Sequence, residues 1–124
     1  MNGTDIFIDT NICIYLLDGD LVVAEMLQDQ GIYISIITEM ELYAYHDSNP
    51  NSLKILNSFI ETVSIVNIEE KVKLNAIKIR KNTKLKLPDS IIAASALTYK
   101  LPLLTADKGL SRVEELDLIL YEKN

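Results

Sequence analysis

The segment Ile6-Phe7-Ile8-Asp9-Thr10-Asn11 is the feature that most constrains the fold of this chain. Three consecutive apolar residues with high β propensity predict a buried strand over residues 5–9. An acid, a hydroxyl and an amide follow at once, so the strand ends in groups that are suited to binding. We therefore expect a sheet in which a buried strand leads directly to a polar site.

Short apolar runs alternate with amphipathic segments along the rest of the chain. Further strands are expected at residues 32–37, 63–66, 103–104 and 118–121, and helices at residues 11–17, 21–28, 39–45, 52–61, 69–84, 87–99 and 107–115. Strands that alternate with helices predict a parallel sheet with helices on both faces. The 124 residues contain no repeat or linker. We therefore expect one α/β domain over residues 1–124, a three-layer α/β/α sandwich.

Three more acids, Glu41, Asp89 and Asp107, occupy junctions of the same kind as Asp9. Asp9, Glu41 and Asp107 come soon after a predicted strand, and Asp89 begins a predicted helix. Because ligands of a parallel sheet bind beyond the carboxyl ends of its strands, we expect the four carboxylates to meet there. Oxygen ligands suit Mg²⁺ or Mn²⁺, which activate a bound water and stabilise a phosphodiester under attack. The four acids are therefore the predicted metal ligands and catalytic residues of a nuclease.

Each acid also has a purely structural interpretation. Asp9 could cap the helix that follows its strand, and Asp89 could be an acid that favours a helix N-terminus. Glu41 could complete a capping box with Thr38, and Asp107 could be a turn residue. These alternatives stay open at the level of the sequence.

Polar neighbours of the acids are candidates for orienting the carboxylates or a bound water, namely Thr10, Asn11 and Thr105. Asn11 could equally be a helix cap. His46 follows Glu41 by five residues, about 140° further round a helix, so we expect a surface or loop histidine away from the site. The single cysteine, Cys13, lies among apolar residues and is expected to be buried and inert.

The net charge of −6 argues against a nucleic-acid partner, but the distribution of charge does not. Residues 71–86 contain seven of the twelve Lys and Arg residues and no acid. These side chains form either a solvated helix face or a surface that binds RNA phosphates, for which the candidates are Lys78, Arg80, Lys81 and Lys84. No signal peptide or membrane-spanning segment is recognisable, so we expect a cytoplasmic protein.

Four stretches of this sequence carry a family resemblance, in the family's order and over nearly the whole chain. They are Ile6 to Asn11, Ser35-Ile36-Ile37-Thr38 running on to Glu41-Leu42, Leu87-Pro88-Asp89 with Ile92-Ala93-Ala94, and Leu104-Thr105-Ala106-Asp107. In these stretches the chain resembles the PIN-domain family, and within it the VapC-type toxins of type II toxin–antitoxin pairs.

The resemblance implies an endoribonuclease that cleaves structured or messenger RNA, with Asp9, Glu41, Asp89 and Asp107 as its acidic site. It also implies a homodimer and a cognate antitoxin, whose tail occupies a groove formed by the helices of residues 39–62. Family members often carry a further acid where this chain has Lys108 and Gly109. A second metal ion therefore has less support than the first.

Two other functions compete with the nuclease. A receiver-like phosphoacceptor domain is also α/β, but it needs an acidic pair after its first strand, which Asp9-Thr10-Asn11 lacks. It also needs a lysine after a late strand, for which Lys108 is a poor substitute. The second alternative is a PIN-like module that binds RNA or a partner without cutting, and the presence of all four acids argues against it.

Overall fold

A sheet of five parallel strands forms the centre of the computed structural model, which describes residues 4–46 and 49–123. The strands are β1 (Asp5–Ile8), β2 (Gly31–Ser35), β3 (Ser64–Val66), β4 (Leu103–Thr105) and β5 (Leu118–Leu120). They lie in the order β3-β2-β1-β4-β5, with β1 in the middle. Receiver domains have the order 2-1-3-4-5, so the receiver-like alternative is excluded.

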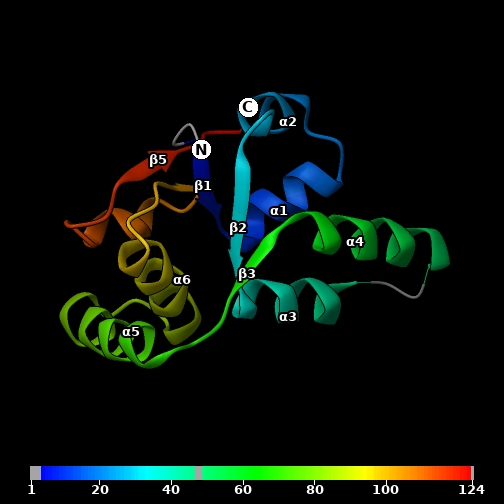
Figure 1. The fold of residues 1–124 in the computed structure, drawn as a ribbon. Coiled ribbons are helices and arrows are strands. Elements are labelled where there is room, and N and C mark those ends of the chain that lie inside the picture. The colour runs from blue at the N-terminus through cyan, green and yellow to red at the C-terminus, as the bar shows by residue number, and fades with distance from the viewer. Residues whose placement is uncertain (1–3, 47–48, 124) are drawn as a thin grey trace.

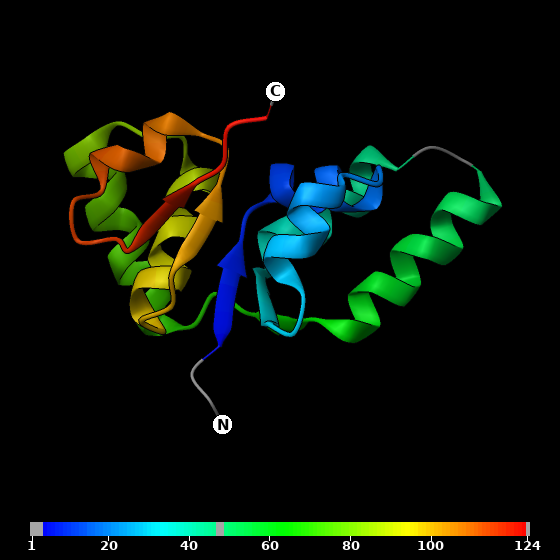
Figure 2. The ribbon, with the colours of Figure 1, turned by 90° about the horizontal axis from the view of Figure 1, so that it is seen from above.

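Helices cover both faces of the sheet, and the predicted three-layer α/β/α architecture is confirmed (Figure 1, Figure 2). Phe7 of β1 faces one helical layer, and its neighbours Ile6 and Ile8 face the other, as the two-residue period of a strand requires. The first layer contains α5 (Glu70–Thr83), α6 (Leu87–Thr98) and the short 3₁₀ helix η1 (Lys108–Arg112); the second contains α1 (Thr10–Leu17), α2 (Leu21–Leu27), α3 (Ile36–Tyr45) and α4 (Pro50–Thr62).

Helix α6 is the buried helix that its apolar sequence predicts. Residues 90–96 are all buried between the sheet and α5. Pro88 lies at the start of the helix, where its missing N–H costs nothing, and Asp89 follows in the first turn. No helix in the described ranges is both long and apolar enough to cross a membrane.

The junction between β2 and α3 differs from the prediction. The strand ends at Ser35, whose side chain caps α3 by accepting a hydrogen bond from the backbone N–H of Ile37 at 3.0 Å. Ile36 and Ile37 are therefore the first helical residues, although their β-branched side chains extend the apolar pattern of the strand. Thr38 lies inside the helix and does not cap it. The capping-box interpretation of Glu41 is therefore wrong.

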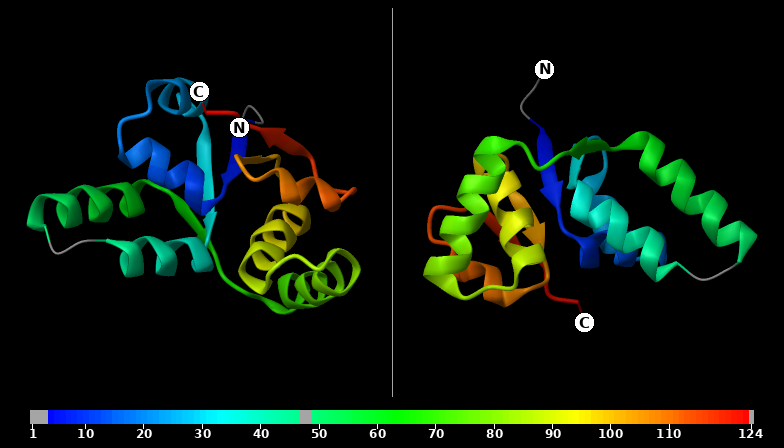
Figure 3. Two further views of the ribbon diagram at one scale, coloured as in Figure 1. Left: turned by 180° about the vertical axis from the view of Figure 1, so that it is seen from behind. Right: turned by 90° about the horizontal axis from the view of Figure 1, so that it is seen from below.

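Helices α3 and α4 project in the same direction from the sheet (Figure 1, Figure 3). Their apolar residues Leu42 and Leu56 pack into the core that also receives α1 and α2. The loop between the two helices includes residues 47 and 48, so part of the turn predicted at residues 46–50 lies outside the described residues. The first helix turn of α4 starts at Pro50, two residues earlier than expected, because Asn49 caps it.

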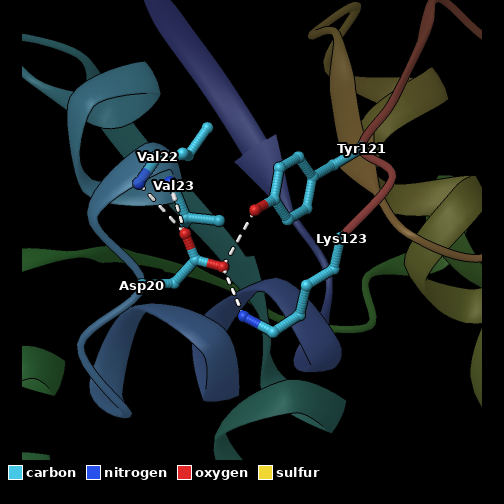
Figure 4. Close-up of polar contacts among 5 residues, drawn as sticks. All are labelled: Asp20, Val22, Val23, Tyr121 and Lys123. Atoms are coloured by element: carbon cyan, nitrogen blue, oxygen red, sulfur yellow. Dashed lines mark hydrogen bonds and ion pairs between the residues drawn. The ribbon is translucent and has the colours of Figure 1, made fainter.

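The chain beyond β5 is held against the turn between α1 and α2 (Figure 4). Asp20 caps α2 by accepting hydrogen bonds from the backbone N–H groups of Val22 and Val23 at 3.0 and 3.1 Å. Its second carboxylate oxygen accepts hydrogen bonds from the Tyr121 hydroxyl at 2.9 Å and the Lys123 ammonium at 2.7 Å. We call Asp20, Tyr121 and Lys123 the Asp20 clasp.

Candidate functional site

A cavity of about 140 Å³ lies where the parallel strands end at their carboxyl edge. It is lined by all four predicted acids and by three further residues, which are Thr10, Asn11 and Ile92. The acids reach it from four separate segments: the end of β1, the second turn of α3, the start of α6 and the segment after β4. A parallel sheet brings these segments together because its strands all end on the same side.

Asp9 is the most buried of the four acids, with 6% of the residue exposed. Its Oδ1 accepts a hydrogen bond from the backbone N–H of Ile12 at 3.1 Å, so Asp9 also caps α1. Its Oδ2 accepts a hydrogen bond from the Thr105 hydroxyl. Burial raises the pKa of Asp9 although both hydrogen bonds oppose the rise, and the nearby charges of Asp107 and Asp89 raise it further.

Asp9 thus has both of the roles that the sequence left open, a place in the cavity and a helix cap. The alternative in which Asn11 caps the helix is wrong, since α1 begins at Thr10 and Asp9 is its cap. Asn11 is instead an exposed residue in the wall of the cavity.

Thr105 joins the Asp9 carboxylate, which follows β1, to the backbone of Asp107, which follows β4. Its hydroxyl is completely buried, donates to Asp9, and accepts a hydrogen bond from the backbone N–H of Asp107 at 3.0 Å. Asp107 caps η1 through a 2.8 Å hydrogen bond from the backbone N–H of Gly109 to its Oδ1. Gly109 leaves room for this carboxylate, because a Cβ at that position would lie 3.0 Å from the same Oδ1.

Asp89 is partly buried at the start of α6, and its pKa is also raised. Burial is the largest cause, followed by the charges of Asp107 and Glu41, while Lys86 acts in the opposite direction. The carboxylates therefore lie close enough to repel one another electrostatically. A bound cation would relieve that repulsion.

Glu41 is exposed on the other side of the cavity and is held by a hydroxyl group. The Thr10 hydroxyl donates a hydrogen bond to Glu41 Oε1 at 2.6 Å. Thr10 Oγ1 also lies 3.0 Å from Oγ1 of Thr38, a fully buried residue. The sequence prediction treats Thr38 as a possible helix cap and so omits it from the site. Inside α3, Thr38 and Glu41 are three residues apart and share one face of the helix.

The donor set of the cavity consists of carboxylate and hydroxyl oxygens, the ligands that Mg²⁺ and Mn²⁺ prefer. Within residues 4–46 and 49–123, no three His, Cys, Asp or Glu side chains already lie close enough together to hold an ion. A metal ion would therefore need at least some of these side chains to move toward the others. The ligand atoms are of the type that a hard divalent cation prefers, but their positions would have to change locally before they could bind one.

The predicted RNA-binding residues lie on α5, except Lys84, which follows the helix with a φ of 64°. All four are exposed. Lys78 and Arg80 are two residues apart, which places them about 200° apart round the helix. The cations are therefore spread over the exposed side of α5, opposite the side on which Val72, Ala76 and Ile79 are buried. Lys78 also lines a second cavity, of about 320 Å³, together with Arg112 of η1.

His46 lies away from the acidic cavity, as predicted, but it is only partly exposed. It ends α3 and lines a groove of about 400 Å³ between α1, α3 and α4. Its Nε2 is buried without a hydrogen-bond partner in the described part of the chain. The rest of the groove is mainly apolar, with Ile14, Leu17, Leu42, Ile55 and Leu56 in its walls.

Comparison with protein families finds that the model of the PIN domain matches residues 6–116, a range that includes the four acids. Among solved structures, a chain in a toxin-antitoxin complex from Klebsiella pneumoniae is 28% identical, with a TM-score of 0.80 over 95% of this chain and 99% of that one. VapBC-1 from nontypeable Haemophilus influenzae gives 25% identity and a TM-score of 0.77, over 94% and 97% of the two chains.

VapBC2 from Rickettsia felis, solved bound to a DNA fragment from its promoter, has the same fold. It is 23% identical, with a TM-score of 0.80 over 95% of this chain and 99% of that one. The comparison with curated proteins finds no match.

Proposed function

The chain belongs to the PIN-domain family, and we propose that it is a metal-dependent endoribonuclease, the toxin of a toxin–antitoxin pair. The observation that carries the proposal is the cavity in which Asp9, Glu41, Asp89 and Asp107 meet from four separate segments. Asp9 and Asp107 also cap helices, but capping does not require four carboxylates to line one cavity, where burial and neighbouring charges raise the pKa values of Asp9 and Asp89. A site for a cation accounts for the arrangement. The cytoplasm, where RNA is available, is the proposed place of action.

The residues of the cavity divide into those that would hold Mg²⁺ or Mn²⁺ and those that orient them. Asp9, Glu41, Asp89 and Asp107 are the proposed ligands, and the ion would supply an activated water and neutralise charge on the phosphodiester. The Thr105 hydroxyl fixes one oxygen of Asp9, and the Thr10 hydroxyl fixes one oxygen of Glu41. The hydrogen bonds therefore limit the rotation of two of the four carboxylates.

Chelation together with one substitution tests the proposed reaction. The full chain with Mg²⁺ or Mn²⁺ should cleave RNA, and EDTA should abolish the cleavage. Asp9→Asn should lower the rate by about a hundredfold or more, because a metal ion contributes several kcal/mol to transition-state stabilisation and each 1.36 kcal/mol is tenfold in rate. Rates are measured on a fluorescent RNA of mixed sequence.

Asp117→Asn is the matched control, because Asp117 is an exposed acid directly before β5, at the amino end of that strand, and does not line the cavity. It should cleave at the parental rate. RNA cleavage that survives both EDTA and Asp9→Asn would contradict the metal mechanism. Tight RNA binding without cleavage by the parental chain would instead favour the non-cleaving module.

Recognition of RNA is proposed to use three cations of α5, Lys78, Arg80 and Lys81, and Lys84 directly after the helix. Replacing all four by Gln should weaken RNA binding by the Asp9→Asn protein and should flatten its salt dependence, because each phosphate contact adds to the slope. The dissociation constant is measured by fluorescence anisotropy between 50 and 200 mM salt, roughly the range over which such contacts are resolved. An unchanged slope would leave these residues as a solvated helix face.

The apolar groove between α1, α3 and α4 is the proposed site for the antitoxin. Its apolar walls and its position between helices suit an amphipathic helix that inserts one face. Two of the similar structures are described as a toxin-antitoxin complex and as VapBC-1, which supports a protein partner for this chain too. A homodimer is proposed on the family resemblance, and light scattering of the purified chain tests it.

A further inference from the structure

Thr38 is a buried polar residue outside the set of proposed metal ligands. It is completely buried on α3, one helical turn before Glu41. Its Oγ1 lies 3.0 Å from Oγ1 of Thr10, the first residue of α1. Thr10 Oγ1 lies in turn 2.6 Å from Oε1 of Glu41. The Thr10 hydroxyl thus joins two residues that stand on the same face of α3.

The direction of the two hydrogen bonds follows from the number of available protons. A threonine hydroxyl has one proton and two lone pairs, whereas an ionised carboxylate can only accept. Thr10 must therefore give its proton to Glu41, and it can only accept from Thr38. The result is a chain of hydrogen bonds from Thr38 to Thr10 to Glu41. It ends at a charged group, where a hydrogen bond is strongest.

We propose that Thr38 is a positioning residue of the metal site, which acts through Thr10 to hold the Glu41 carboxylate at the cavity. The inference rests on the proposed metal-dependent function. Glu41 is exposed on α3 and has a long flexible side chain, so it has several orientations unless a partner selects one. With Oε1 held by Thr10, the other carboxylate oxygen stays available to a cation.

Two further observations place Glu41, where this series of hydrogen bonds ends, in the site. Glu41 and Thr10 both line the cavity, together with Asp89. The charge of Glu41 is one cause of the raised pKa of Asp89, so these two carboxylates are electrostatic neighbours. Thr38 itself does not line the cavity, and it can influence a bound ion only through Thr10 and Glu41.

Titration of the full chain with Mn²⁺, followed by electron paramagnetic resonance, tests the inference without depending on cleavage. Thr38→Val keeps the shape of the side chain and removes the hydroxyl, and it should raise the Mn²⁺ dissociation constant by about tenfold, as is usual when a group that orients a ligand is removed. Thr38→Ser restores the hydroxyl and should bind Mn²⁺ within about twofold of the parental chain. If Thr38→Val does not fold, Thr38→Ala replaces it.

Thr98→Val is the matched control, because Thr98 is also a helical threonine whose hydroxyl forms hydrogen bonds away from the cavity. It should leave Mn²⁺ binding unchanged, whatever its melting temperature. A Thr38→Ser protein that loses as much Mn²⁺ affinity as Thr38→Val would overturn the inference, since a loss of packing alone would then explain both.

A double-substitution cycle with Glu41→Gln separates a positioning role from a general structural one. In the Glu41→Gln protein, Thr38→Val should change Mn²⁺ affinity less than twofold, because the carboxylate that Thr38 positions is already gone. An equal loss in both backgrounds would overturn the inference while leaving the proposed function intact. A parental chain that binds no Mn²⁺ and cleaves no RNA would overturn both.

Discussion

The buried hydroxyl of Thr105 bonds to the Asp9 carboxylate and to the backbone of Asp107, two residues of the cavity. It donates to Asp9 and accepts from the backbone N–H of Asp107, so one side chain fixes the ends of β1 and β4 relative to each other. The hydrogen bond from Thr105 also opposes the effect of burial on the pKa of Asp9. A hydroxyl can meet both demands because it donates and accepts at once.

Thr105→Val should therefore affect both stability and metal binding. The backbone N–H of Asp107 would lose its partner, which should lower the free energy of unfolding by about 1–3 kcal/mol. Asp9 would lose the donor that orients it, so Mn²⁺ affinity should fall by about tenfold. Urea unfolding and Mn²⁺ titration measure the two effects.

Thr105→Ser is the control for this prediction, because serine retains the hydroxyl at the same position. It should recover most of the metal affinity, although it loses a buried methyl group. Full Mn²⁺ affinity in Thr105→Val would show that the hydrogen bond to Asp9 has no part in metal binding.

The elements around the cavity explain why the acids were predictable from the sequence and some of their partners were not. An apolar strand that ends in an acid identifies Asp9 and Asp107 from local pattern alone, because parallel strands share one carboxyl edge. The local pattern does not identify Thr38 as a site residue. Ile36 and Ile37 continue the apolar pattern of the strand, so the sequence does not show that α3 begins at Ile36. The position of a helix start decides which face a residue occupies.

The basic residues of α5 show the same limit at the level of an element. Their number and the absence of acids over residues 71–86 are plain in the sequence, but a cluster along the chain need not be a cluster in space. Lys78 and Arg80 lie about 200° apart round the helix, and Lys78 and Arg112 of η1 both line the second cavity. A cavity shared by residues 34 positions apart cannot be predicted from local composition.

The groove formed by α1, α3 and α4 gives a prediction at the scale of these elements. Ile55 lines it from α4 and is 57% exposed, so its replacement should leave the fold intact. Ile55→Glu should lower the affinity for an apolar partner helix by about a hundredfold or more, because binding would bury an unpaired carboxylate. The probe is a small protein that is encoded by an adjacent reading frame and co-purifies with the parental chain, and the affinity is measured by calorimetry.

Leu74→Glu is the matched control, because Leu74 is 55% exposed on α5, outside the groove. It should bind the same partner with parental affinity. If the partner binds the Ile55→Glu and Leu74→Glu proteins equally tightly, it does not use the groove.

At the scale of the whole molecule, the Asp20 clasp joins the end of the described chain to the second helical layer. Asp20 and Tyr121 are 101 residues apart, so no local pattern predicts their contact. The Tyr121 ring also packs edge-on against Tyr15 of α1, and Lys123 Nζ lies 4.9 Å from the centre of the Tyr15 ring. The backbone N–H of Tyr121 bonds to Thr105 O at 2.7 Å, so the same segment contacts the residue that orients Asp9.

Because of the clasp, the free energy of unfolding should depend on pH in the acidic range. The hydrogen bond from Lys123, with help from the backbone N–H of Val23, lowers the pKa of Asp20 to about 2. An unfolded aspartate has a pKa of about 3.9, so the folded chain releases this proton more readily than the unfolded one. The stabilisation is therefore present above about pH 4 and is lost as the pH falls toward 2. Asp20→Asn keeps the cap acceptor but removes the charge, so it should be less stable than the parental chain at pH 7.

That difference should shrink as the pH falls below about 4 and should be small near pH 2, where Asp20 is about half protonated in the folded chain. Lys123→Met should reproduce the same pH profile, since it removes the other charge of the pair. Glu25→Gln changes an exposed acid of α2. The difference between its melting temperature and that of the parental chain should be the same at every pH. Thermal unfolding between pH 2 and 7 measures all four proteins. A gap between Asp20→Asn and the parental chain that stays constant from pH 7 to 2 would show that the charge of Asp20 contributes nothing, and that the clasp acts only through its uncharged contacts.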